Sequence, residues 1–218
     1  MKSNADLQHE VLEELQVEPG VKATTIGVTA EGRVVTLTGY VDSFPAKWAA
    51  ENAVKRVVGV KGIANELEVR LPAFWERTDT EIAQAAVNAL EWDVYVPLDC
   101  ITVKVENGWL TLDGEVESQF QKNAAVNTVR NLAGVKGLTN LIAIKKPTVT
   151  PANVKAQIEK ALLHSAEVDA ARIMVEARDG KVILHGCVRS LLEREEAERA
   201  TWAVPGVTVV ENRILIEP

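Results

Sequence analysis

Residues 35–43 read VTLTGYVDS, residues 110–118 read LTLDGEVES, and residues 182–190 read VILHGCVRS. The second stretch begins 75 residues after the first, and the third begins 72 residues after the second. The first, third and seventh positions are apolar in all three, which fits the period-two pattern of a half-buried β-strand. Because a glycine and a serine hold the same places in each copy, the chain contains one structural unit that is repeated three times.

The same offsets align almost the whole chain of 218 residues with itself. Nearly all residues that recur in the three copies are apolar residues, glycines or serines, which are residues that shape a backbone. We therefore expect three modules, over residues 1–72, 73–147 and 148–218. A module of about 70 residues buries only about 60% of the surface that its unfolded chain exposes, so we also expect contacts between modules.

Each copy has the same predicted order of helices and strands. Apolar residues four apart, such as Leu7, Val11 and Leu15, predict a short amphipathic helix at the start. Two alternating segments follow, joined in the second copy by Asn107-Gly108, a dipeptide typical of a two-residue hairpin. The serine that ends each quoted stretch is a good N-cap for a second helix, and a third strand follows that helix. The prediction is an α+β fold of three tandem αββαβ modules, each a three-stranded mixed sheet packed on two helices.

Six recurring glycines are assigned to backbone geometry. One set lies inside the second strand, where we expect close packing of a helix against the sheet, with a bulge or a close backbone approach as the alternative. The other set follows the second helix and fits the left-handed residue that ends a helix. The two sets are Gly39, Gly114 and Gly186 in the strand, and Gly59, Gly134 and Gly206 after the helix.

A strand with this glycine and serine, a second glycine twenty residues after the first, and an Asn six residues further on together resemble the BON domain. The resemblance covers residues 7–69, 82–144 and 154–216. It implies a non-catalytic binding module, associated in its family with envelope stress, attachment to phospholipid and, in some members, assistance to other proteins. The chain looks most like triple-BON proteins without an export signal, and the family offers no catalytic residues to assign.

Composition and charge narrow the class of partner and the location. The net charge of −7 is spread evenly, as −2, −3 and −2 over the three copies, so no basic region predicts a nucleic-acid partner. No apolar run is long enough for a transmembrane segment. The first residues lack the apolar core of a secretion signal, so the expected location is cytoplasmic. Cys100 and Cys187 lie at non-equivalent positions, which favours reduced thiols.

No residue pattern predicts catalysis. The three histidines, His9, His164 and His185, fall at non-equivalent places in the repeat and belong to no zinc or nucleophile motif. We therefore expect no enzyme activity, no metal and no cofactor. An enzyme would require a deep cleft that gathers titratable groups with shifted pKa values, for instance His164 with Cys187 and an acid.

Five residues are candidates for contact with a lipid or a partner. Lys47, Lys122 and Arg194 make one position of the second helix basic in every copy, and could meet anionic headgroups. Nearby acidic residues weaken that patch, so ordinary surface cations are the alternative. Trp109 and Trp202 stand where the other copies carry Val, Lys or Arg, and packing between repeats is the first explanation, with a membrane or partner as the second.

The sequence therefore predicts a stress-related, non-enzymatic binding or scaffold protein that engages anionic phospholipid or envelope-associated partners. The alternative is a chaperone-like or assembly protein that presents apolar surfaces between modules to other proteins. An oligomer is compatible with both, and the ligand itself is not determined by the residues.

Overall fold

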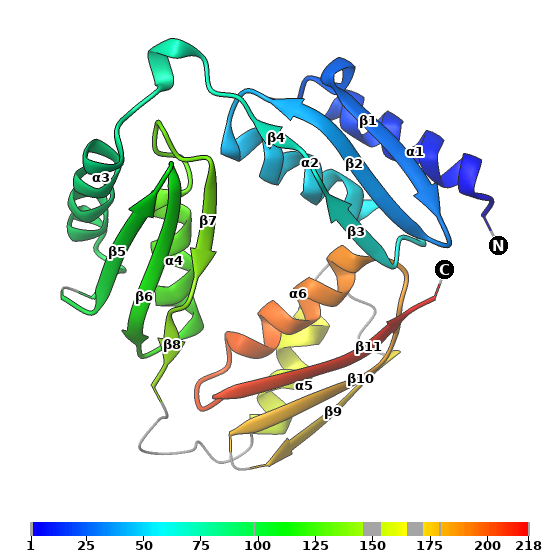
Figure 1. The fold of residues 1–218 in the computed structure, drawn as a ribbon. Helices are drawn as coiled ribbons and strands as arrows, with labels where there is room; N and C mark the ends of the chain where they lie inside the picture. Colours follow the sequence, from blue (N-terminus) through cyan, green and yellow to red (C-terminus); the bar gives the residue numbers. More distant parts are fainter. Residues whose placement is uncertain (1, 98, 146–153, 165–171, 179, 218) are drawn as a thin grey trace. The chain divides into compact units, whose positions relative to one another are not determined.

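The computed structural model describes residues 2–97, 99–145, 154–164, 172–178 and 180–217 (Figure 1). Three separate mixed sheets follow one another along the chain, each with helices packed on it. The predicted α+β class, with three tandem modules, is confirmed.

The first module begins with helix α1 (Asn4–Val17) and a short 3-10 turn. Strands β1 and β2 pair antiparallel, and β2 pairs parallel with β3 and then with β4. Helix α2 connects β2 to β3. The bounds are η1 (Ala23–Thr25), β1 (Ile26–Glu31), β2 (Val34–Val41), α2 (Phe44–Arg56), β3 (Gly62–Asn65), β4 (Glu68–Val69) and η2 (Ala73–Trp75).

The second and third modules repeat this order. Each has one antiparallel strand pair and a parallel third strand. The bounds in the second module are α3 (Asp79–Trp92), β5 (Ile101–Glu106), β6 (Trp109–Val116), α4 (Gln119–Val129), β7 (Gly137–Asn140) and β8 (Ala143–Ile144). Those in the third are α5 (Val154–His164), β9 (Ile173–Arg178), β10 (Lys181–Val188), α6 (Leu191–Trp202) and β11 (Val209–Ile216).

The third strand differs from the prediction in two of the modules. It is continuous over eight residues in the third module, as β11, but is split into four-residue and two-residue segments in the first two. Both segments still lie against the same neighbour, because β6 pairs with β7 and then with β8. The sheets therefore have four, four and three strands.

The predicted apolar spacing and caps occur at the expected places. Leu7, Val11 and Leu15 are the buried residues of α1. The Ser118 hydroxyl accepts a hydrogen bond from the Gln121 N–H, which caps α4, and the corresponding serine caps α6. These contacts satisfy N–H groups that a helix start leaves without a partner inside the helix.

The chain folds into two compact units. Unit 1 comprises residues 1–39, 49–66 and 147–218, and unit 2 comprises residues 40–48 and 67–146. Within unit 1, the Lys55 ammonium lies 2.8 Å from the Glu195 carboxylate. Within unit 2, Phe44 packs against the core around α3 and β6, and the Arg130 guanidinium lies 4.1 Å from the centre of the Trp48 ring.

Candidate functional site

The strand glycines are required by the neighbouring backbone. Gly39, Gly114 and Gly186 have φ of 109°, 146° and 137°, and a Cβ atom on them would lie 2.2, 2.0 and 2.0 Å from a carbonyl oxygen just before the first strand of the module. The expectation that a helix packs on them was wrong, and the alternative of a close backbone approach is correct. These residues therefore serve the strand pairing.

The glycines after the second helix also have left-handed φ values, of 99° at Gly59, 90° at Gly134 and 94° at Gly206. The helices end earlier than expected, however, since α2 stops at Arg56 and α4 at Val129. A short turn separates each helix from its glycine.

The three recurring basic residues donate hydrogen bonds to backbone carbonyls of the third strand or of the residues that join its two segments. Lys47 Nζ lies 2.7 Å from the Leu67 oxygen, and Lys122 Nζ lies 2.5 Å from the Ile142 oxygen. In the third module the acceptor is two residues before the corresponding position, because Arg194 Nη2 lies 3.2 Å from the Asn212 oxygen. The corresponding charges thus have partners inside the module.

The recurring Asn completes this arrangement. Asn140 Oδ1 accepts the Ile142 N–H at 3.1 Å, and Asn212 Oδ1 accepts the Ile214 N–H at 3.1 Å. These N–H groups point away from the adjacent strand, since Leu141, the residue between Asn140 and Ile142, donates its own N–H to β6. The Asn and the basic residue therefore occupy the outer edge of the third strand, where an unpaired edge would otherwise attract other chains. Loss of hydration lowers the pKa of Lys122.

The two candidate tryptophans contact their own modules. The Trp109 side chain is half exposed, its ring lies against Gly137, and its Nε1 donates to the Thr139 hydroxyl at 2.8 Å. Trp202 packs against the core of the third module. The contacts between repeats that we expected from these tryptophans are made elsewhere, by Phe44 and Trp48 within unit 2.

The thiols and histidines are scattered among the described residues. Cys100 and Cys187 are free and half-buried, and loss of hydration with the Glu217 carboxylate raises the pKa of the Cys187 thiol. A thiol with a raised pKa carries little of the reactive thiolate. In the ranges that the structure describes, no group of three His, Cys, Asp or Glu side chains is placed to hold a metal ion. The side chain of His164 lies outside the described residues.

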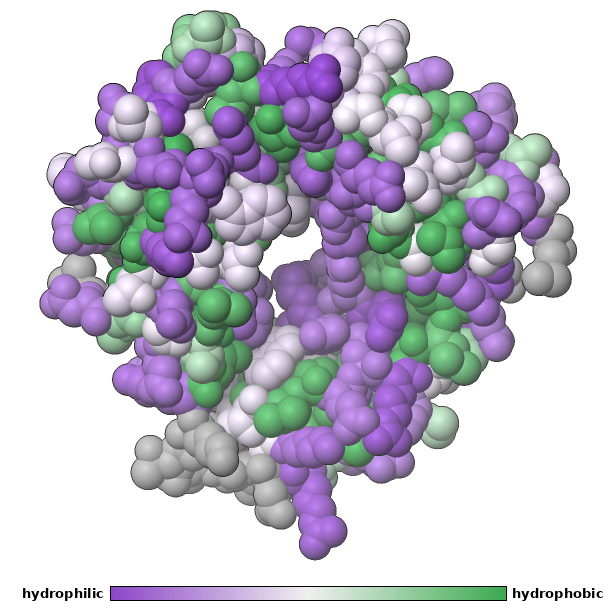
Figure 2. Space-filling model, in the orientation of Figure 1, coloured by the Kyte–Doolittle hydropathy of each residue, from purple (hydrophilic) through white to green (hydrophobic). Residues whose placement is uncertain are grey.

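Of the described residues, the most exposed large apolar ones lie at the end of α3 and in the loop that follows it. The exposed fraction is 87% for Trp92 and 90% for Val94. Tyr95 is also exposed and stacks edge-on against Phe120, with ring centres 5.0 Å apart. We call Trp92, Val94, Tyr95 and Phe120 the apolar loop cluster. Figure 2 shows one face of the molecule, on which hydrophilic residues surround apolar areas.

A carboxylate holds this loop in place. Asp93 lies between Trp92 and Val94, and its oxygens accept hydrogen bonds from the Thr128 hydroxyl and from the Tyr95 N–H. The Thr128 hydroxyl, and then the Tyr95 N–H, hold the pKa of Asp93 below its ordinary value. The apolar side chains on either side of Asp93 are thus presented by an anchored turn.

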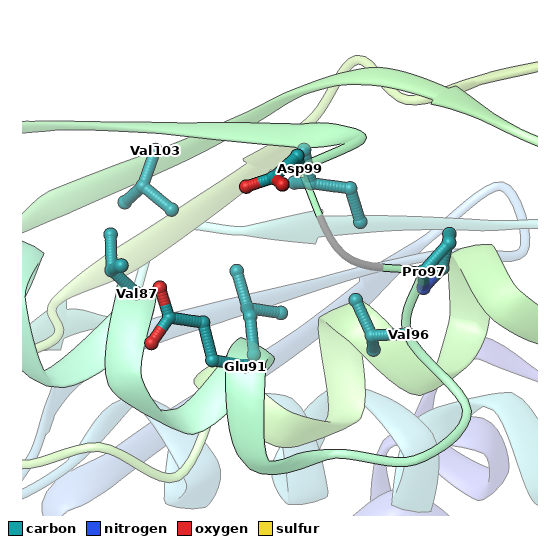
Figure 3. A pocket seen from close by; sticks show the side chains of 8 residues that line it. Val87, Glu91, Val96, Pro97, Asp99 and Val103 are labelled. Atoms are coloured by element: carbon teal, nitrogen blue, oxygen red, sulfur yellow. The ribbon is translucent and has the colours of Figure 1, made fainter.

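A small cavity lies beside the same loop, between α3 and β5 (Figure 3). Val87 and Glu91 face it from α3, and Asp99 and Val103 face it from the start of β5 and the residues before it. Its volume is about 90 Å³, and its remaining lining residues are Leu90, Val96, Pro97 and Ile101.

The sequence analysis missed both the apolar loop cluster and the cavity. The signal for the cluster was available, because Trp92 aligns with Val17 and His164 at a position that does not recur. Because the fold was predicted from recurring residues, the non-recurring Trp92 was not among the candidates. The cavity had no such signal, since it depends on how far α3 lies from the edge of β5.

The fold places this chain among proteins that are built from small α+β modules in tandem. The family model for the BON domain matches residues 3–70, 78–146 and 151–218. The chain therefore belongs to the BON domain family, as the resemblance predicted. None of the helices in the described ranges combines the length and apolar character that a membrane crossing needs.

One curated relative and two solved structures complete the comparison. Osmotically-inducible protein Y of Escherichia coli (strain K12) is 30% identical over 129 residues, covering 57% of this chain and 64% of that protein. The chain thus spans less than two thirds of that relative. Structures of CdsD, a structural protein of the Type III secretion system of Chlamydia trachomatis, and of its C-terminal domain are 18% and 17% identical. They cover 98% and 100% of this chain, and it covers 93% and 100% of theirs. Their TM-scores of 0.27 and 0.26 are too low to support an argument.

Proposed function

We propose that this chain is a non-enzymatic, stress-related binding protein whose second module contacts a phospholipid surface through the apolar loop cluster. Membership in the BON family and the similarity to an osmotically inducible protein support the stress-related, non-enzymatic part. The single observation that carries the lipid part is the almost complete exposure of Trp92 and Val94 on an anchored turn.

Several observations favour a lipid surface for this cluster. Trp and Tyr are enriched at membrane–water interfaces, where an apolar ring and a polar edge are both accommodated. Trp92, Val94 and Tyr95 lie within four consecutive residues, so they can enter a membrane surface together at a shallow depth. Full burial of one such side chain contributes about 1.5–3 kcal/mol. Two or three together supply the affinity of a reversible surface contact.

The charges near the cluster determine how the lipid would be selected. Glu91 and Asp93 flank Trp92, so an anionic headgroup gains nothing from the immediate surroundings. Lys47, Lys122 and Arg194, the headgroup contacts expected from the sequence, are each engaged with a carbonyl. We therefore propose that apolar insertion provides most of the binding, with these cations and Trp109 or Trp202 as secondary contacts.

Vesicle flotation tests this function. The full chain is mixed with neutral and with anionic phospholipid vesicles, and the fraction that floats is compared with that of Trp92→Ser/Val94→Ser. The double variant should weaken partitioning by about tenfold or more, because even half of the burial energy of two side chains exceeds 1.4 kcal/mol. Val17→Ser is the matched control, since Val17 holds the corresponding place in the first module and is 74% exposed.

Each outcome has a clear meaning. If the same fraction of Trp92→Ser/Val94→Ser and of the unchanged chain floats with the vesicles, the proposed lipid contact is contradicted. A salt-sensitive preference for anionic vesicles would assign the main contact to the basic positions instead. Binding of an unfolded client protein without flotation would favour the chaperone-like alternative. The cytoplasmic location stays a prediction, which fractionation of the producing cells can check.

A further inference from the structure

The first strand of each module lies at the edge of its sheet, and its backbone groups have a definite direction. Leu112 accepts the Leu141 N–H on the β7 side of β6, at 2.8 Å. Val103 lies opposite Leu112 in the antiparallel register. Residues opposite each other in such a pair point their N–H and C=O groups either toward each other or away from each other. The N–H and C=O of Val103 therefore point to the free edge of β5.

The corresponding edge of the first module is covered. Gln8 Nε2 of α1 donates to the Val28 oxygen at 2.8 Å, and Val28 occupies the place of Val103. In the second module the position of Gln8 is taken by Ala83, which has no donor. Among the described residues, no hydrogen bond from another segment reaches the Val103 oxygen.

The second module also leaves the side chains of this strand more accessible. Ile26 and Val28 in β1 are 7% and 6% exposed, and the corresponding pair in β9 is buried as well. Ile101 and Val103 in β5 are only half-buried. Both side chains line the cavity, together with Val87 and Leu90 of α3. Figure 3 shows Val103 and Val87 on the two sides of it.

The other edge of the sheet is closed by side chains. Asn140 and Lys122 bind the outward N–H and C=O of Ile142. An added strand would have to displace both. Of the two edges of this sheet, β5 is therefore the open one.

The size and charge of the cavity indicate what fits beside β5. A volume of about 90 Å³ equals the liquid volume of about three water molecules, which suits one short apolar side chain such as valine. Glu91 and Asp99 line the cavity, and no ion pair with either occurs within the described residues. Asp99 is held at a left-handed φ of 59°, so its carboxylate direction is set by an unusual backbone. Basic side chains complement these two acids.

We propose that β5 receives an extended peptide segment of another protein as an additional strand. Backbone hydrogen bonds along β5 supply affinity, and the cavity takes one apolar side chain of the segment. Lys or Arg residues two positions before and after that side chain point to the same face of the added strand and lie near Glu91 and Asp99. The segment thus carries an apolar residue with a basic residue two positions before and after it, and its binding does not require the proposed lipid contact.

A peptide titration of the full chain, without lipid, tests the site. The probe is Thr-Lys-Thr-Val-Thr-Lys-Thr with blocked ends and a fluorescent label, in which the Val and both Lys side chains share one face of the strand. Affinity is measured by anisotropy. A matched peptide with Glu in place of Lys should bind about tenfold more weakly, since two surface charge pairs of up to about 1 kcal/mol each are lost. Methylation of alternate peptide N–H groups should abolish binding.

Protein variants locate the bound peptide. Ala83→Gln introduces the side chain that covers the first module and should weaken binding about fivefold or more, whereas Ala85→Gln, on the exposed side of α3, should not. Glu91→Gln/Asp99→Asn should remove the preference for the basic peptide, and Glu115→Gln, on the exposed face of β6, should keep it.

Amide hydrogen exchange supplies the direct readout. Bound peptide should slow exchange at Val103 and Val105, whose N–H groups face the free edge. Binding without protection there, equal affinity for the two peptides, or an unchanged affinity in Ala83→Gln would overturn the proposal.

Discussion

Replacement of Gly39 by Ala should be among the most damaging single changes in the first module. A Cβ at this position would lie 2.2 Å from the Thr25 oxygen and 3.3 Å from its carbonyl carbon, and both are backbone atoms. The strand pair Ile26 to Gly39 would have to separate for the new atom to fit. The φ of 109° adds strain for any residue other than glycine.

The magnitude follows from two contributions. A non-glycine residue in a sparsely populated region of φ costs about 1–3 kcal/mol. Forcing an extra carbon into a packed site costs about 1–3 kcal/mol more. The sum of about 2–6 kcal/mol is comparable to the whole stability of a small domain.

The assay is native-state amide hydrogen exchange in β1 and β2, which reports the opening free energy of this sheet. Gly32→Ala is the matched control in the same module, because Gly32 also has a left-handed φ, of 55°, but nothing lies within 4 Å of its Cβ position. Gly32→Ala should cost only the backbone contribution. If Gly39→Ala lowers the opening free energy no more than Gly32→Ala does, the close approach to Thr25 does not explain the recurring glycine.

Three further predictions concern single side chains. Ser190→Ala removes the cap of α6 and should lower the free energy of unfolding by about 0.5–2 kcal/mol in urea titrations. Lys122→Met leaves the Ile142 oxygen without its ammonium donor and should cost about 1–3 kcal/mol by the same measurement, whereas no loss would mean that the contact is incidental. The pKa of Asp93 is depressed in the folded chain, so its contribution to stability is present above the ordinary carboxyl pKa of about 3.9 and is lost as the pH falls through the folded value. Thr128→Val should raise that pKa, as a carboxyl NMR titration would show.

Some functional features could be predicted from residue pattern and some could not. The basic position of the second helix is recognised in the sequence because it recurs, and the sequence leaves it open between headgroup contacts and ordinary surface cations. The contact of Lys47 with the Leu67 oxygen joins residues 20 apart in sequence, and nothing local in either residue indicates it. The apolar loop cluster was missed for the opposite reason, since Trp92 stands at a position that does not recur and its exposure depends on the surrounding segments.

By itself, the sequence determined the repeat and the order of helices and strands, because both follow from short-range periodicity and from glycine, serine and apolar residues at recurring places. The family was indicated by the resemblance of these places to the BON domain. Only the tertiary structure decided that the strand glycines face a backbone oxygen, that Lys122 and Asn140 close one sheet edge, and that β5 stays open beside an acidic cavity. The physical reason is that these properties depend on distances between segments far apart in the chain. Such distances are set by how helices and strands pack, and residue identity along one segment does not contain them.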